Sequence, residues 1–188
     1  MTENLDAIFG AGNYTVSIPQ RTAGPATVNA NPGFDGSTDT ELIAAGSSLQ
    51  PGETATIEVE VTVNVIVDAQ DNGLGLFTNQ VTLTAMDDVG NVFTDDSHNG
   101  TDPDPSGDGD PTNDSDPSNG NLTPDGTVGA AKTATVAEDN NGVIFDFYLE
   151  HLGNTPVDVS LVEDLAATFN TGGTFNVCLL YTSDAADE

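Results

Sequence analysis

The sequence has very few of the residues on which binding to nucleic acids or to anionic membranes depends. Lysine and arginine together occur twice in 188 residues, against 31 aspartates and glutamates, which gives a formal net charge of -29. Phosphate backbones and anionic lipid surfaces are both bound mainly through such cationic side chains. The composition therefore predicts no nucleic-acid partner. An acidic surface attracts cations such as Ca²⁺, and it also keeps an exposed protein soluble.

Tryptophan is absent, cysteine occurs once, and no apolar run approaches the length of a membrane span. A lone cysteine forms no intramolecular disulfide. We therefore expect no membrane insertion in this segment. Valine and threonine are abundant, while glycine, proline, asparagine and aspartate interrupt the chain at short intervals. That composition is typical of an all-β protein.

Patterns associated with catalysis are also missing. The histidines, His98 and His151, have no partner at a spacing typical of a nucleophile and base or of a zinc site. No G-x-S-x-G, P-loop or H-E-x-x-H pattern occurs. Paired acids such as Asp87-Asp88 and Asp95-Asp96 could act in a glycosidase, but solvated turns explain them better. The sequence predicts that the chain is not an enzyme.

The C-terminal tail CLLYTSDAADE, residues 178–188, does not continue the pattern that precedes it. It resembles the translation of a transposase adapter that is used in the preparation of DNA libraries. We therefore expect this tail, with Cys178, to be an artefact. The alternative is a genuine C-terminal strand that buries a free cysteine.

An internal repeat links the two ends of the chain. TENLDAIFGAG at 2–12 resembles VEDLAATFNTG at 162–172, with an offset of 160, and the match continues after one inserted residue. The matched pairs are Leu5 and Leu165, Ala7 and Ala167, Phe9 and Phe169, Gly12 and Gly172, Tyr14 and Phe175, and Val16 and Val177. Met1 falls on Leu161, inside a strand-like run, so we expect that natural sequence precedes it. The absence of a signal peptide then carries no information.

Alternating apolar residues predict short strands separated by turns. The expected strands are 13–18, 26–30, 54–67, 77–86, 127–138, 143–152 and 157–165, with a weaker element at 40–45. Turns are expected at 49–53 and 87–91. This pattern indicates an antiparallel β-sandwich. We expect a partial repeat at 1–95 that lacks its first strands, an acidic linker at 96–126, and the first strands of the next repeat at 127–177. In an isolated chain, 127–177 could supply the missing strands, giving one circularly permuted sandwich with the linker as a surface loop.

Four segments carry a family resemblance: LQPGETATIEVEVTV, FTNQVTLTA, AAKTATV and FYLEHLGNTPVDVSLVEDL. Together they resemble the tandem Ig-like repeats of large bacterial surface and secreted proteins, the DUF11-like or conserved repeat domains. The resemblance covers nearly the whole chain apart from the tail. It implies an Ig-like sandwich in an extracellular stalk or adhesin, with neighbouring repeats of the same chain as partners. The alternative is a calcium-dependent module that binds a surface carbohydrate or a protein.

The acidic stretch TDPDPSGDGDPTNDSDPS at 101–118 consists of three units of the form x-D-x-D-P-[ST]. Compared with an EF-type calcium loop, it has suitable residues at positions one, three, five and nine, but Asn113 stands at position twelve. A second register that begins at Asp114 ends on an acid at position twelve. The candidate calcium ligands are Asp102, Asp104, Ser106, Asp108, Asp110, Asp114, Asp116 and Asp125. The alternative is a proline-stiffened, self-repelling linker without a bound ion.

Lys132 is one of the two cationic side chains, and it lies on the expected strand at 127–138. In some surface Ig-like domains a strand lysine forms an isopeptide bond with an asparagine, helped by a buried acid. Here Asn79 is the candidate partner, and Asp146 or Glu150 is the candidate acid. The alternative is a lysine at a sheet edge, where its charge discourages aggregation.

Overall fold

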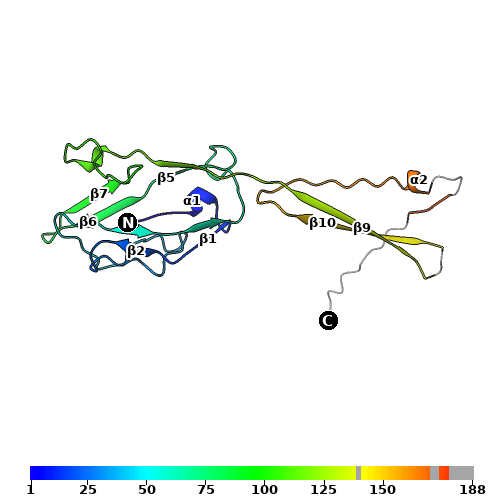
Figure 1. Cartoon of the computed structure of the whole chain (residues 1–188), viewed down its shortest axis with the longest axis horizontal. Coiled ribbons are helices and arrows are strands. Elements are labelled where there is room, and N and C mark those ends of the chain that lie inside the picture. The colour runs from blue at the N-terminus through cyan, green and yellow to red at the C-terminus, as the bar shows by residue number, and fades with distance from the viewer. Residues whose placement is uncertain (139–140, 170–173, 178–188) are drawn as a thin grey trace. The chain divides into compact units, whose positions relative to one another are not determined.

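A computed structural model describes residues 1–138, 141–169 and 174–177 (Figure 1). The chain divides into two compact units, Met1–Val157 and Asp158–Glu188. The described residues contain two α-helices of a single turn each, α1 (Asp6–Phe9) and α2 (Leu165–Thr168), and a short 3₁₀ turn, η1 (Pro111–Asn113). The prediction of an all-β chain is confirmed. The adapter-like tail at 178–188 lies outside the described residues.

Ten strands in the described part of the chain form five antiparallel pairs. These are β1 (Tyr14–Val16) with β4 (Val61–Val63), β2 (Gln20–Ala23) with β3 (Thr56–Glu58), β5 (Leu76–Asn79) with β8 (Ser118–Asn121), β6 (Thr82–Met86) with β7 (Val92–Asp96), and β9 (Val128–Val136) with β10 (Val143–His151). No pair merges with another into a larger sheet within the described ranges. Antiparallel pairing is thus confirmed, while the two-sheet sandwich stays a prediction.

The long strand expected at 54–67 is divided into β3 and β4. These two short strands pair with β2 and β1, and the register shifts by one residue between the two pairs, from Val16 opposite Val61 to Gln20 opposite Glu58. Pro19 lies at the shift. Because proline has no backbone N–H, it cannot donate to a ladder, and such an interruption commonly produces a bulge. The predicted strand is therefore present, but it is divided into β3 and β4 where the register shifts at Pro19 of the partner segment.

The strand expected at 77–86 is likewise divided, because it has two partners. β5 pairs with β8, and β6 pairs with β7. Gln80 lies between β5 and β6, and its side-chain Nε2 donates to the carbonyl oxygens of Ser97 and Ser115. One glutamine therefore joins both partner segments at the point where the strand changes partners.

Two of the expected strands are wrong. Residues 26–30 and 157–165 contain no strand, and Ala30 forms only an isolated bridge with Ile43 of the weaker element at 40–45. Thr2 makes similar bridges to Glu41 and Thr82. The alternating pattern at 26–30 leaves Val28 buried, but neither this segment nor 157–165 has a partner strand in the described residues.

The core of the first unit is small and centres on α1. Its buried members are Leu5, Ile8, Phe34 and Leu42. Leu5 N donates to Gly36 O at 2.8 Å, and a Cβ at Gly36 would lie 2.5 Å from Leu5 Cδ1. Gly36 also has a φ of 74°, so glycine is required there both by conformation and by the close approach of Leu5.

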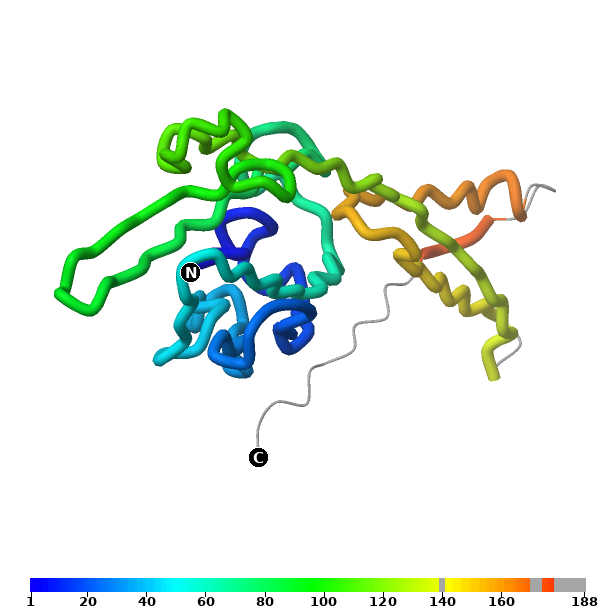
Figure 2. Tube along the Cα trace, turned by 60° about the vertical axis from the view of Figure 1, so that its left-hand side comes forward, coloured from blue at the N-terminus to red at the C-terminus, as the bar shows by residue number. Residues whose placement is uncertain are grey.

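β9 and β10 form the longest pair, with nine residues in each strand, as the sequence predicted. In the described residues these two strands pair only with each other, so 127–177 adds no strand to a ladder of 1–95. The contacts between these segments that we observe are near Ile66, whose N–H donates to Asn154 O at 2.7 Å and whose carbonyl accepts from Thr155 Oγ1 at 3.3 Å. The expected circularly permuted sheet is therefore not present in the described ranges. Figure 2 shows β6 and β7 as a second hairpin that reaches away from the rest of its unit.

Candidate functional site

Residues 99–116, which we call the acidic loop, form a loop whose two ends are hydrogen-bonded to each other. Asn99 N donates to Asp116 O at 2.7 Å, and the Ser97 and Ser115 carbonyls share the side chain of Gln80. Of the eight candidate calcium ligands the loop contains seven, namely Ser106 and six of the seven aspartates. The segment expected to be a linker is thus a closed surface loop that continues into β8.

The carboxylates of the acidic loop accept hydrogen bonds from the loop itself. Asp104 accepts from Gly107 N at 3.0 Å, from Gly109 N at 2.9 Å and from Ser106 Oγ at 3.2 Å. Asp108 accepts from Asn113 Nδ2 and from Asp110 N, both at 2.9 Å. The hydrogen bond from Asn113 is the main reason that the pKa of Asp108 lies below its usual value. Donors of the loop itself therefore hold both carboxylates in place.

Asp125 lies apart from the acidic loop. Its carboxylate accepts from Thr127 N at 2.9 Å and from Thr127 Oγ1, and the bond to the Thr127 side chain is the first cause that lowers the pKa of Asp125. Its backbone carbonyl accepts from Asn154 N at 2.8 Å. Asp125 therefore anchors the start of β9 next to the end of β10. Within the described residues, the histidine and acidic side chains form no group of three arranged around a cation position. The calcium site remains a prediction.

Lys132 lies in the middle of one face of the β9–β10 hairpin. Its Nζ is 4.1 Å from the ring centroid of Phe145 and 5.4 Å from that of Phe147. Because Lys132 pairs with Phe147 in the register, Asp146 and Glu150 lie on the opposite face. Asp146 accepts a hydrogen bond from Thr133 Oγ1 at 3.3 Å on that face. The strand geometry separates the two candidate acids from the candidate lysine.

A different acid lies beside Asn79. Asn79 Nδ2 donates to Glu3 Oε2 at 3.1 Å, and the Glu3 side chain is 5% exposed. Burial raises the pKa of Glu3, and the hydrogen bond from Asn79 lowers it less. Asn79 Oδ1 is buried without a hydrogen-bond partner. A buried carboxyl that favours its proton can donate to an amide oxygen and polarise the amide towards attack by an amine.

Sequence reasoning identified Asn79 but missed Glu3. A signal was present, because the offset of 160 places Glu163 opposite Glu3, so both copies carry an acid two residues before the matched leucine. Burial was the missing information. Glu3 becomes buried because residues 1–3 lie between Thr40 and Thr82, with Glu3 N donating to Thr40 O at 2.9 Å and Thr2 N donating to Thr82 O at 2.9 Å.

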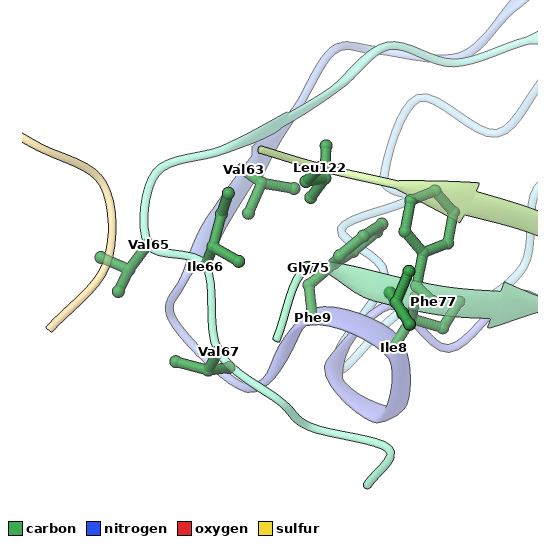
Figure 3. A pocket seen from close by; sticks show the side chains of 10 residues that line it. Ile8, Phe9, Val63, Val65, Ile66, Val67, Gly75, Phe77 and Leu122 are labelled. Atoms are coloured by element: carbon green, nitrogen blue, oxygen red, sulfur yellow. The ribbon is translucent and has the colours of Figure 1, made fainter. Parts of the chain in front are cut away.

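The cavity in Figure 3 offers little to a ligand. It has a volume of about 10 Å³ and is lined by apolar side chains of α1, the 63–67 segment, β5 and Leu122, together with the backbone of Gly75. Ligand sites usually exceed roughly 300 Å³ and contain a few polar groups that orient the ligand. A space of this size holds about one water molecule, so it is a packing gap beside Phe9 and Phe77.

The internal repeat has a structural counterpart. α1 and α2 occur at matching positions, within one residue of the 160 offset. The rings of Phe9 and Tyr14 lie 6.1 Å apart with an interplanar angle of 58°, and those of Phe169 and Phe175 lie 5.9 Å apart at 44°. Each unit thus contains a single helical turn followed by an aromatic pair.

The two copies of the repeat differ at two positions that form a hydrogen bond in the first copy. In the first copy, Tyr14 Oη donates to Asp6 Oδ1 at 2.8 Å, and burial together with this contact raises the pKa of Tyr14. In the second copy, Ala166 stands where Asp6 is and Phe175 stands where Tyr14 is. The acceptor and the hydroxyl donor are therefore lost together, as expected when a partly buried hydroxyl would have no partner.

Burial also differs between the copies. Leu5 is 3% exposed, whereas its counterpart Leu165 is only half-buried and Phe169 is 39% exposed. No helix in the described ranges is both long and apolar enough to cross a membrane. No known protein family, curated protein or solved structure matches the chain.

Proposed function

We propose that the chain is one repeat length of an extracellular bacterial surface or secreted protein, in which β modules in tandem act as a stalk or spacer. The observation that carries this proposal is the recurrence, 160 residues apart, of a helical turn and an aromatic pair. In the first copy the turn packs in a buried core, whereas the turn of the second copy contains no buried residue. A repeat whose turn lacks a core is what a tandem array gives when it is divided inside a module.

The role of such a module is mechanical. Folded β units joined in series project a functional end of the protein away from its anchor, and the charge of -29 keeps the array soluble and its modules apart. The acidic loop would contribute by binding Ca²⁺ at the millimolar concentrations found outside cells, which would neutralise its carboxylates and make it more rigid.

The alternative of a binding module is less well supported. A carbohydrate or peptide site needs a concave surface with several polar groups that converge. The described cavity beside Phe9 is small and apolar, so it does not provide such a surface. A stalk or spacer requires neither a concave surface nor converging polar groups.

A long sequencing read across the genomic locus on both sides of this segment tests the proposal. We expect further copies at an offset near 160 and a signal peptide upstream. A locus that instead continues into one catalytic or lectin-like domain, without further copies, would make the segment an accessory module and overturn the stalk.

A further inference from the structure

One face of the β9–β10 hairpin is apolar and only partly covered. Side chains of directly paired residues share a face, so the register defines this set, which we call the hairpin face. Its apolar members are Val128, Ala130, Ala134, Val136, Val143, Phe145, Phe147 and Leu149. Phe147 is 37% exposed and Leu149 is 55% exposed, although this is the face that a sandwich would bury. Lys132, which stacks on Phe145 and Phe147, is its only lysine, arginine or acid, and His151 lies at its end opposite Val128.

A second apolar face lies on the β6–β7 hairpin, which extends from its unit (Figure 2). Ala85 pairs with Phe93 and Leu83 pairs with Asp95, so these four residues share one face, which we call the body face. Phe93 is 58% exposed and Leu83 is 42% exposed. Asp95 is its only charged member, and the Oδ1 atom of Asp95 is buried without a hydrogen-bond partner. The two faces therefore carry similar apolar side chains and opposite single charges.

The internal repeat indicates what covers these faces. The segment at 162–177 that follows the hairpin matches residues 2–16, which in the first unit lie against the core. The hairpin thus precedes α2 in the way that an equivalent hairpin would precede α1 in a complete module. Under the proposed function the chain carries the later part of one module and the first part of the next, and a second copy would supply the surface that each part lacks.

We propose that the hairpin face of one copy packs on the body face of a second copy, so that molecules associate head to tail. The inference rests on the proposed function, because it uses the same module boundaries. Docking of this kind places Lys132 of one copy on the face that carries Asp95 of the other, and buries Phe147 and Phe93 together. Such an interface is heterologous, because the two surfaces differ, and it produces open chains of molecules rather than a closed symmetric dimer.

Charge gives the association a characteristic salt dependence. Each copy carries a net charge of -29, so two copies repel each other at low ionic strength. The screening length falls from about 30 Å at 0.01 M salt to about 3 Å at 1 M. Association of the full chain is expected to become stronger as NaCl rises over this range, which is the reverse of an interface that depends on surface ion pairs.

The test uses sedimentation velocity on the full chain in 1 M NaCl. Phe147→Ser removes the centre of the hairpin face and leaves the body face intact, and Phe93→Ser does the reverse. Each variant alone is expected to lose association by more than about tenfold. In an equimolar mixture, the intact hairpin face of Phe93→Ser is expected to bind the intact body face of Phe147→Ser. The resulting dimers grow no further, because the two faces that remain unoccupied are the altered ones. Tyr148→Ser is the matched control, since Tyr148 is 57% exposed on the opposite face of the same strand.

Three results would overturn the proposal: a wild-type chain that stays monomeric at every salt concentration, a mixture of the two variants that does not associate, or a Tyr148→Ser variant as defective as Phe147→Ser. Leu149→Ser repeats the hairpin test at a second position, with far-UV circular dichroism to show that the hairpin stays folded. A monomeric wild type together with tandem copies at the locus would remove this inference and leave the stalk proposal intact. A locus without further copies would overturn the stalk proposal.

Discussion

Asn79 Nδ2 donates a 3.1 Å hydrogen bond to Glu3 Oε2, and this contact joins the N-terminal segment to the end of β5. Glu3 is almost fully buried and its carboxyl favours the neutral form, mainly because of desolvation. Protonation of Glu3 is therefore coupled to folding.

Replacing Glu3 tests this relationship. Burial raises the pKa of Glu3 above its value of 4.5 in the unfolded chain, so the folded state holds the proton more tightly. The stability that Glu3 contributes is present below pH 4.5 and is lost as pH rises through its raised folded pKa. Glu3→Gln, which mimics the neutral acid, is expected to gain stability relative to wild type between pH 4 and pH 8 in urea unfolding. Glu58→Gln, an exposed acid on β3, is the control and should show no such gain.

The repeat provides a matched pair of core substitutions. Leu5→Ala is expected to reduce the free energy of unfolding by about 3 kcal/mol, because Leu5 is 3% exposed in the main cluster. Leu165→Ala at the matching position should reduce it by less than about 1 kcal/mol, because Leu165 is only half-buried. Equal losses in chemical denaturation would show that the second copy has a core of its own.

Asp35 organises part of the segment between β2 and β3. Its carboxylate accepts from Ser37 N and Thr38 N, both at 2.8 Å, and from Thr38 Oγ1, which is the largest cause that lowers the pKa of Asp35 to about 2. The stability that it contributes is present above pH 3.8 and is lost as pH falls through about 2. NMR titration of the carboxyl carbon should give a midpoint near 2, and Asp35→Asn should remove this acid-dependent step, while Asp88→Asn should not.

Two substitutions distinguish the two possible registers of a calcium site, the one that contains Asp104 and the one that ends at Asp125. Isothermal calorimetry at millimolar Ca²⁺ is expected to show heat, which Asp104→Asn reduces by more than about tenfold in affinity. Asp125→Asn should have no effect, because Asp125 anchors β9 through Thr127 outside the loop. The absence of heat in the wild-type chain would remove the calcium proposal.

The mass of the intact chain tests the isopeptide hypothesis. Lys132 stacks on two phenylalanines, and Asp146 and Glu150 lie on the other face of its hairpin, so we expect the full calculated mass. A mass lower by one ammonia would contradict this expectation. In that case Glu3 would be the assisting acid, and Glu3→Gln would restore the full mass while Asp146→Asn would not.

The sequence predicted local structure well where the partner strand follows directly. β9 and β10 were expected almost to the residue, because Val128 to Val136 and Val143 to His151 alternate and the turn between them is short. The β6–β7 turn was also expected, from the residues at 87–91. In the structure, Asp87 accepts from Val89 N and Asn91 N in the way that turn aspartates do. Both features depend on neighbours within the hairpin itself.

Features set by distant partners could not be predicted. The division at Pro19 affects residues 56–63, about 40 positions away in the chain, and Gln80 holds two segments that only the fold brings together. The burial of Glu3 depends on Thr40 and Thr82 on either side of it. A periodic pattern carries no information on which strand will be the neighbour, so these positions had to come from the structure.

The closed base of the acidic loop has an evolutionary consequence. Because Asn99 and Asp116 are hydrogen-bonded to each other, six-residue units can be gained or lost between them without moving β7 or β8. Doubling the length of a flexible loop costs only about 0.6 kcal/mol in closure entropy. Gain or loss of one such unit would therefore change the number of carboxylates in the loop while β7 and β8 keep their places.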